Sequence, residues 1–119
     1  MSQESNISFG LKEVSKGIFS VSLGESVLGG NEALNFSSSL LELNQKKVKN
    51  VIVDLQNVKL INSSGIGMLV SGLTTLKKND ANLILVGLSD KIKSLLKMTH
   101  LDKIFPTYDN VDEAIRSIG

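Results

Sequence analysis

The first part of the chain alternates apolar and polar residues, and this period is typical of β-strands. Residues 7–14 form one such extended segment, and residues 17–23 carry apolar side chains separated by small polar ones. Residues 15–17, Ser-Lys-Gly, provide a turn between the two segments. We therefore predict a hairpin at the start of the fold.

The next apolar pattern is helical. Residues 24–30 are rich in glycine and predict a loop, after which Asn31 can cap a helix that ends near Lys47, with Val48 close to its end. The apolar residues of this helix are Leu34, Leu40 and Leu41. A first α-helix is therefore expected after this loop.

Two later runs have the composition of strands that are buried on both faces of a parallel sheet. Residues 51–55, Val-Ile-Val-Asp-Leu, are short and β-branched, and residues 83–86 are a second run of the same kind. The residues between them that recur at helical spacing are Ile66, Leu69, Val70, Leu73 and Leu76. This order predicts a βαβ unit whose first strand is central in the sheet.

The C-terminal part repeats the alternation of helix and strand. Ser89 can cap a helix, Ile104 and Phe105 suggest a short strand before Pro106, and Asp109 can open a last helix. The apolar residues of these two helices are Ile92, Leu95, Leu96, Val111, Ala114, Ile115 and Ile118. The predicted fold class is α/β, with a mixed β-sheet, a leading antiparallel hairpin and about four α-helices.

Size and composition indicate an ordinary globular domain. The chain has 119 residues, of which 41% are hydrophobic and 21% charged, so we expect one domain over residues 1–119 with a frayed tail at residues 1–6. The net charge is +1 and the lysines are scattered, which argues against nucleic acid as a partner. Two lysine pairs, at residues 46–47 and 77–78, suit solvated helix ends.

Several kinds of site are excluded by what the sequence lacks. The absence of cysteine rules out disulfides, thiolate metal sites and cysteine nucleophiles, and no metal or other cofactor is expected. No apolar run approaches the roughly 20 residues needed to cross a bilayer, and the first six residues do not resemble a signal peptide. We therefore expect a cytoplasmic protein without membrane insertion.

The segment with the most chemical information is residues 60–70, where a strand exit passes two serines and two glycines into the predicted helix. The first turn of a helix has unpaired N–H groups and a partial positive charge, so it favours an oxygen there. Ser63 or Ser64 occupies this position and could simply be the N-cap. Capping does not explain Gly65 and Gly67, which weaken a helix and suggest close approach to its backbone.

Residues 62–67, Asn-Ser-Ser-Gly-Ile-Gly, resemble the Asp-Ser-Ser/Thr-Gly-Leu/Ile-Gly motif of bacterial anti-sigma factor antagonists in the STAS family. The predicted order of elements agrees over essentially the whole chain, so the resemblance implies a single STAS domain. It also implies transcription regulation by partner switching. A partner that is both serine kinase and anti-sigma factor would phosphorylate the first serine, and the unphosphorylated form would bind that partner and free the sigma factor.

By position in the motif, the phosphorylated serine is Ser63, with Ser64 as the second candidate. The resemblance also implies a PP2C-type phosphatase that reverses the modification. Phosphorylation would place a charge of about −1.5 to −2 on the contact surface without refolding. The residues expected to contact the partner are Asn62, Ser63, Ser64, Gly65, Ile66, Gly67 and Met68. Met68 is included because it lies off the predicted apolar face of the helix. Asn62 departs from the family's aspartate, which weakens the case for phosphorylation.

Enzymatic alternatives lack essential residues. Residues 65–67 begin like a dinucleotide fingerprint, but Val70 occupies the third glycine position. His100 has no recognisable triad partners and is expected at a helix end, and Asp54 is expected to accept an N–H in the turn after its strand. We therefore expect no catalytic residues. The remaining alternative is a constitutive STAS scaffold or an accessory subunit of a signalling or membrane transport complex.

Overall fold

The computed structural model describes residues 10–118, and the expected frayed tail at residues 1–6 lies outside them. The strands are β1 (Gly10–Ser15), β2 (Ile18–Ser22), β3 (Ser26–Val27), β4 (Asn50–Asp54), β5 (Leu60–Ile61), β6 (Asn82–Val86) and β7 (Thr107–Tyr108). The helices are α1 (Asn31–Gln45), α2 (Ser63–Lys77), α3 (Asp90–Met98), the 3-10 helix η2 (Leu101–Lys103) and α4 (Val111–Ile118).

The main sheet has five strands in the order β1-β2-β4-β6-β7. The β1–β2 pair is antiparallel, whereas β2–β4, β4–β6 and β6–β7 are parallel. The predicted hairpin is therefore confirmed, and β4 is central as expected because its apolar residues are buried on both faces. The loop predicted for residues 24–30 is partly wrong, because β3 lies within it and pairs in parallel with β5.

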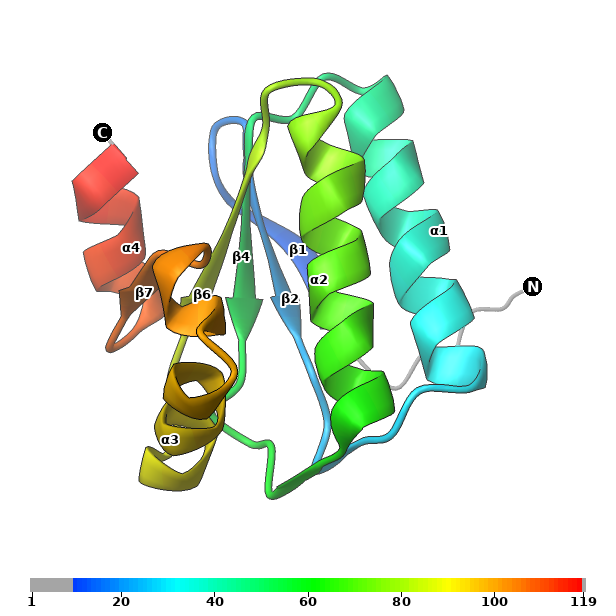
Figure 1. Ribbon diagram of the computed structural model, residues 1–119. Helices are drawn as coiled ribbons and strands as arrows, with labels where there is room; N and C mark the ends of the chain where they lie inside the picture. The colour runs from blue at the N-terminus through cyan, green and yellow to red at the C-terminus, as the bar shows by residue number, and fades with distance from the viewer. Residues whose placement is uncertain (1–9, 119) are drawn as a thin grey trace.

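Helices cover both faces of the sheet, as Figure 1 shows. α1 and α2 lie side by side on one face, and their apolar residues form the larger core cluster with β4 and β6. α4 lies on the opposite face, where Ala114 joins a smaller cluster with Ile18, Ile52 and Ile84. No helix within residues 10–118 has the length and apolar character that a membrane span requires.

The start of α1 differs from the prediction. Gly30, with a φ of 68°, occupies the N-cap position, and Asn31 is the first helical residue without capping through its side chain. Leu34 and Leu41 are exposed, because the face that meets α2 carries Phe36, Leu40 and Leu43 at helical spacing. Only Leu40 of the three predicted apolar residues is therefore buried.

The C-terminal elements are displaced from their predicted positions. Ile104 and Phe105 do not form a strand; β7 follows Pro106 and is in register with Leu85 and Val86 of β6. The prediction is wrong because Phe105 is buried in the core rather than paired in the sheet. α4 starts later than Asp109. The cap of this helix is Asn110, whose side chain accepts a hydrogen bond from Glu113 N at 2.9 Å.

Candidate functional site

The start of α2 is organised by Asn62, which follows β5. The Asn62 side-chain oxygen accepts a hydrogen bond from Gly65 N at 2.9 Å, and its backbone oxygen accepts one from Ile66 N at 3.0 Å. Asn62 is therefore the N-cap, so neither serine performs this role. Within residues 10–118, the hydroxyls of Ser63 and Ser64 make no hydrogen bond.

The seven residues that were expected to contact a partner differ in their exposure to solvent. Asn62, Ser63, Ser64 and Gly67 are exposed. Gly65, Ile66 and Met68 are buried. The exposure expected for Met68 is wrong: its side chain is 5% exposed and belongs to the main core cluster. The reason is that α2 packs against α1 at its side and against β6 beneath, so its buried face is wider than one apolar stripe.

The two glycines of the motif have different surroundings. A Cβ atom on Gly65 would collide with the carbonyl oxygen of Val27 in β3 and would lie 2.8 Å from Ile61 Cγ1. The close approach that Gly65 permits is therefore to the chain itself, and it lets the β3–β5 pair support the first turn of α2. A Cβ atom on Gly67 would meet nothing within 4 Å, so this glycine faces open space.

Ser63 and Ser64 also differ in their neighbours. Ser64 lies against the loop before α1, because a Cβ atom on Gly29 would be 2.9 Å from Ser64 Cβ. Ser63, in contrast, lines a groove of about 170 Å³ between α2 and α3. The groove is lined by Ile61, Asn62, Ser63, Ile66, Leu95 and Thr99. Ser63 is thus the serine that borders an open, largely apolar depression.

Exposed apolar side chains surround the start of α2. Leu60 precedes Asn62 by two residues and is 50% exposed, and Leu28 follows the β3 residue that pairs with Ile61 and is 45% exposed. Met98, next to Thr99 of the groove, is 76% exposed. Exposed apolar side chains that gather in one region are typical of protein-binding surfaces. The sequence reasoning missed these residues because they come from three separate segments.

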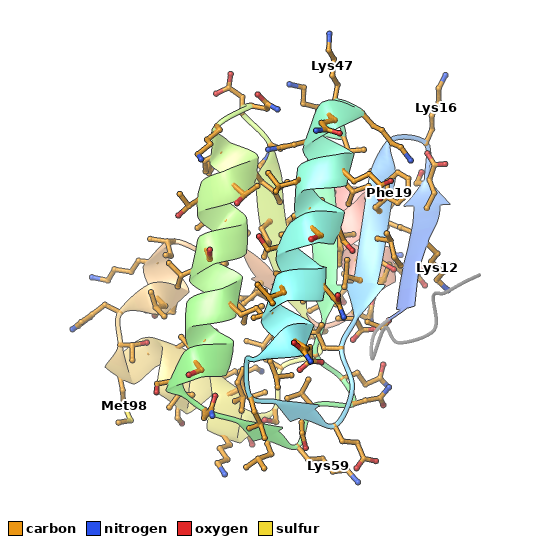
Figure 2. All side chains as sticks on the ribbon, turned by 90° about the vertical axis from the view of Figure 1, so that its right-hand side faces the viewer. Lys12, Lys16, Phe19, Lys47, Lys59 and Met98 are labelled. Carbon is orange, nitrogen blue, oxygen red and sulfur yellow. The ribbon has the colours of Figure 1, made fainter. Side chains whose placement is uncertain are left out.

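Charge is distributed unequally along α2. Its first turn contains no acidic residue, so the partial positive charge of the helix start is not neutralised there. The lysine pairs lie where they were predicted, beside the C-terminal ends of α1 and α2. Figure 2 shows Lys47 at the end of the molecule opposite Met98 and Lys59. An anionic group at Ser63 would therefore lie beside the electropositive end of α2.

The other residues considered from the sequence have structural roles. His100 is exposed and adopts a left-handed conformation after α3, with a φ of 63°. Asp54 Oδ1 accepts a hydrogen bond from Gln56 N at 2.9 Å, as expected for the turn after its strand. In the part of the chain that the structure describes, no three histidine or acidic side chains are grouped in a way that could hold a metal ion.

Sequence comparison supports the resemblance noted from the motif. Residues 11–114 match the family model of the STAS domain. The anti-sigma-B factor antagonist of Staphylococcus aureus (strain NCTC 8325 / PS 47) is 36% identical over 62 residues. These residues cover 52% of this chain and 57% of the relative, so the match spans little more than half the length of that protein.

Solved structures share the fold at low sequence identity. An anti-sigma factor antagonist from Mycobacterium paratuberculosis superposes with a TM-score of 0.77 and 20% identity, over 98% of this chain and 97% of that one. The Bacillus cell fate determinant SpoIIAA in its phosphorylated form superposes with a TM-score of 0.75 and 17% identity, over 93% and 99%. Together with the family match over residues 11–114, the architecture leads to one conclusion: the chain belongs to the STAS domain family.

Proposed function

We propose that this protein is an anti-sigma factor antagonist of the cytoplasm that binds an anti-sigma factor with serine kinase activity and is released when Ser63 is phosphorylated. The observation that carries the proposal is the exposed, unbonded Ser63 hydroxyl at the start of α2, bordered by exposed apolar side chains. The name of the staphylococcal relative, an anti-sigma-B factor antagonist, supports the same function.

The geometry suits a switch that acts by charge. The kinase partner would transfer the γ-phosphoryl group of ATP to Ser63 Oγ, with loss of the hydroxyl proton and departure of ADP. The phosphate adds about −1.5 to −2 charges beside an apolar docking surface. A buried charge without a partner typically costs about 2–5 kcal/mol at an interface, which weakens binding by roughly 30-fold to several thousand-fold.

The neighbours of the two serines favour Ser63 over Ser64 as the acceptor. Ser63 opens onto the groove beside α3, whereas Ser64 is close to Gly29. Access from the groove side would serve both the kinase and the PP2C-type phosphatase that we expect to reverse the reaction. Ser63 also lies in the first turn of α2, whose dipole stabilises a phosphate in the free protein.

Asn62 fits this scheme although the family's motif has aspartate there. Its neutral amide oxygen already caps Gly65 N, so the helix start is formed without a carboxylate. An aspartate at this position would place a negative charge next to the phosphate on the following residue, Ser63, and repel it. We therefore expect Asn62 to make the phosphorylated state easier to accommodate.

Binding and mass measurements test the proposal. The complex with the anti-sigma factor should persist in Ser63→Ala and be lost in Ser63→Asp, while Ser64→Ala should behave like the unmodified protein. Incubation with the kinase and ATP should add one phosphate to the protein and none to Ser63→Ala. Equal binding by Ser63→Asp and Ser63→Ala would instead indicate the constitutive scaffold.

A further inference from the structure

A second open site lies on the sheet face that carries α4. This helix packs over β4, β6 and β7, and beside it a groove of about 410 Å³ extends toward the β1–β2 hairpin. Side chains of β1, β2, β4 and α4 line the groove. It is separate from the groove beside Ser63, because the two share no lining residue.

The strand register brings hydroxyl and charged side chains together in this groove. Ser20 of β2 pairs with Lys12 of β1, and Ser22 pairs with Asp54 at the end of β4. Successive residues of β2 on this face are Ile18, Ser20 and Ser22, so the face changes from apolar to polar as the strand proceeds. The polar half of the face coincides with the groove.

Ser20 places a hydroxyl group at the wall of this groove. Its side chain is 2% exposed, lines the groove, and makes no hydrogen bond within the part of the chain that the structure describes. Its Oγ is not sealed in the core, because it keeps contact with the groove although the residue as a whole is buried. The hydroxyl is therefore available to a group that enters the groove.

The charges around the groove favour a cation. The groove is lined by three acidic residues, Glu13, Asp54 and Asp112, and by one basic residue, Lys12, whose strand forms the edge of the sheet in Figure 2. Glu13 Oε2 and Asp54 Oδ1 each accept one backbone N–H at 2.9 Å, which leaves the second oxygen of each carboxylate without a hydrogen bond in the described chain. The apolar residues of the wall are Val14, Val111 and Ile115.

We infer that this groove binds an organic cation, an alkylammonium or guanidinium group on a short apolar stem. The N–H donors of such a group would bind Asp54, Asp112 and the Ser20 hydroxyl, and the stem would contact the apolar wall. The cation can be a free diamine or a basic side chain of a protein segment, because both have the same donor chemistry. The site is independent of phosphorylation at Ser63.

Amide chemical shifts of the whole protein test this inference, with putrescine as the free diamine and N-acetyl-arginine amide as the side-chain probe. At least one probe should cause saturable shifts in residues 12–22 and 111–115. Ser20→Ala and Asp112→Asn should each weaken its binding at least threefold. Asp102→Asn removes an exposed carboxylate outside the groove and should leave the affinity unchanged. Glutamate should cause no saturable shift at the same residues.

The relative affinity of the two probes identifies the source of the cation. Tighter binding of putrescine indicates a free diamine, and tighter binding of the arginine derivative indicates a basic protein segment. The inference is overturned if neither probe saturates, if Ser20→Ala and Asp112→Asn bind as well as Asp102→Asn, or if glutamate shifts the same amides. Thermal unfolding of each variant shows whether a loss of binding follows from a loss of the fold.

Discussion

Alanine at Gly65 and alanine at Gly67 are the same substitution, two residues apart in α2, but should have opposite effects on stability. At Gly67 the new methyl group enters open space, so the helix gains roughly 0.5–1 kcal/mol from the higher helix propensity of alanine. At Gly65 the methyl group would collide with the Val27 carbonyl and approach Ile61. Overpacking of this kind costs about 1–3 kcal/mol, and a backbone atom cannot rotate away as a side chain can.

Urea unfolding of the two variants and the unmodified protein measures the difference. With a slope of about 1–3 kcal/mol per M, the two variants should differ in midpoint by roughly 1 M, with Gly67→Ala the more stable. Shifts of the Val27 and Ile61 amides in Gly65→Ala would locate the strain at the β3–β5 pair. If Gly65→Ala unfolded at the same urea concentration as Gly67→Ala or at a higher one, close packing of Gly65 against Val27 would be refuted.

Three further predictions concern caps and backbone conformation. Asn62→Ala removes the acceptor for Gly65 N and should lower the free energy of unfolding, measured in urea, by about 1 kcal/mol. Asn62→Asp keeps an acceptor and should leave this free energy unchanged. Ser89→Ala removes the bond from Ile92 N and should cost about 1 kcal/mol, with faster amide exchange in α3 than in α2. Lys47 has a φ of 63°, a left-handed conformation that glycine adopts without strain. Lys47→Gly should therefore raise the urea midpoint of unfolding, because the backbone strain that it relieves, roughly 1–2 kcal/mol, exceeds the entropy cost of glycine. An unchanged or lower midpoint would contradict this.

The elements that were predicted correctly are those whose pattern is local. β4 and β6 are short β-branched or aliphatic runs, and the alternation of β1 and β2 with a glycine in their turn defines the hairpin. Ser89 was identified as a cap because its hydroxyl acts within one turn. Such signals depend on residues a few positions apart, so the sequence contains them directly.

The predictions that were wrong depend on packing between distant segments. α1 has leucines on several sides, and only contact with α2 decides that Leu40 is buried and Leu34 and Leu41 are exposed. Met68 is buried because α2 has neighbours on two sides. The role of Gly65 could not be foreseen either, because the two-residue strand β3 that it touches has no detectable pattern in the sequence.

The parallel order of the sheet has a consequence for how the protein folds. Ile18 pairs with Asn50, and Asn50 pairs with Asn82, so each of the two central pairings joins residues 32 positions apart. Closing a loop of that length costs about 3 kcal/mol of chain entropy, which slows the pairing. A hairpin such as β1–β2 closes only a short turn and forms in roughly microseconds. During synthesis the hairpin can therefore form early, whereas the β4–β6 pairing beneath α2 has to wait until β6 has left the ribosome. The crossover from β4 through α2 to β6 is therefore completed late, after most of the chain has been made.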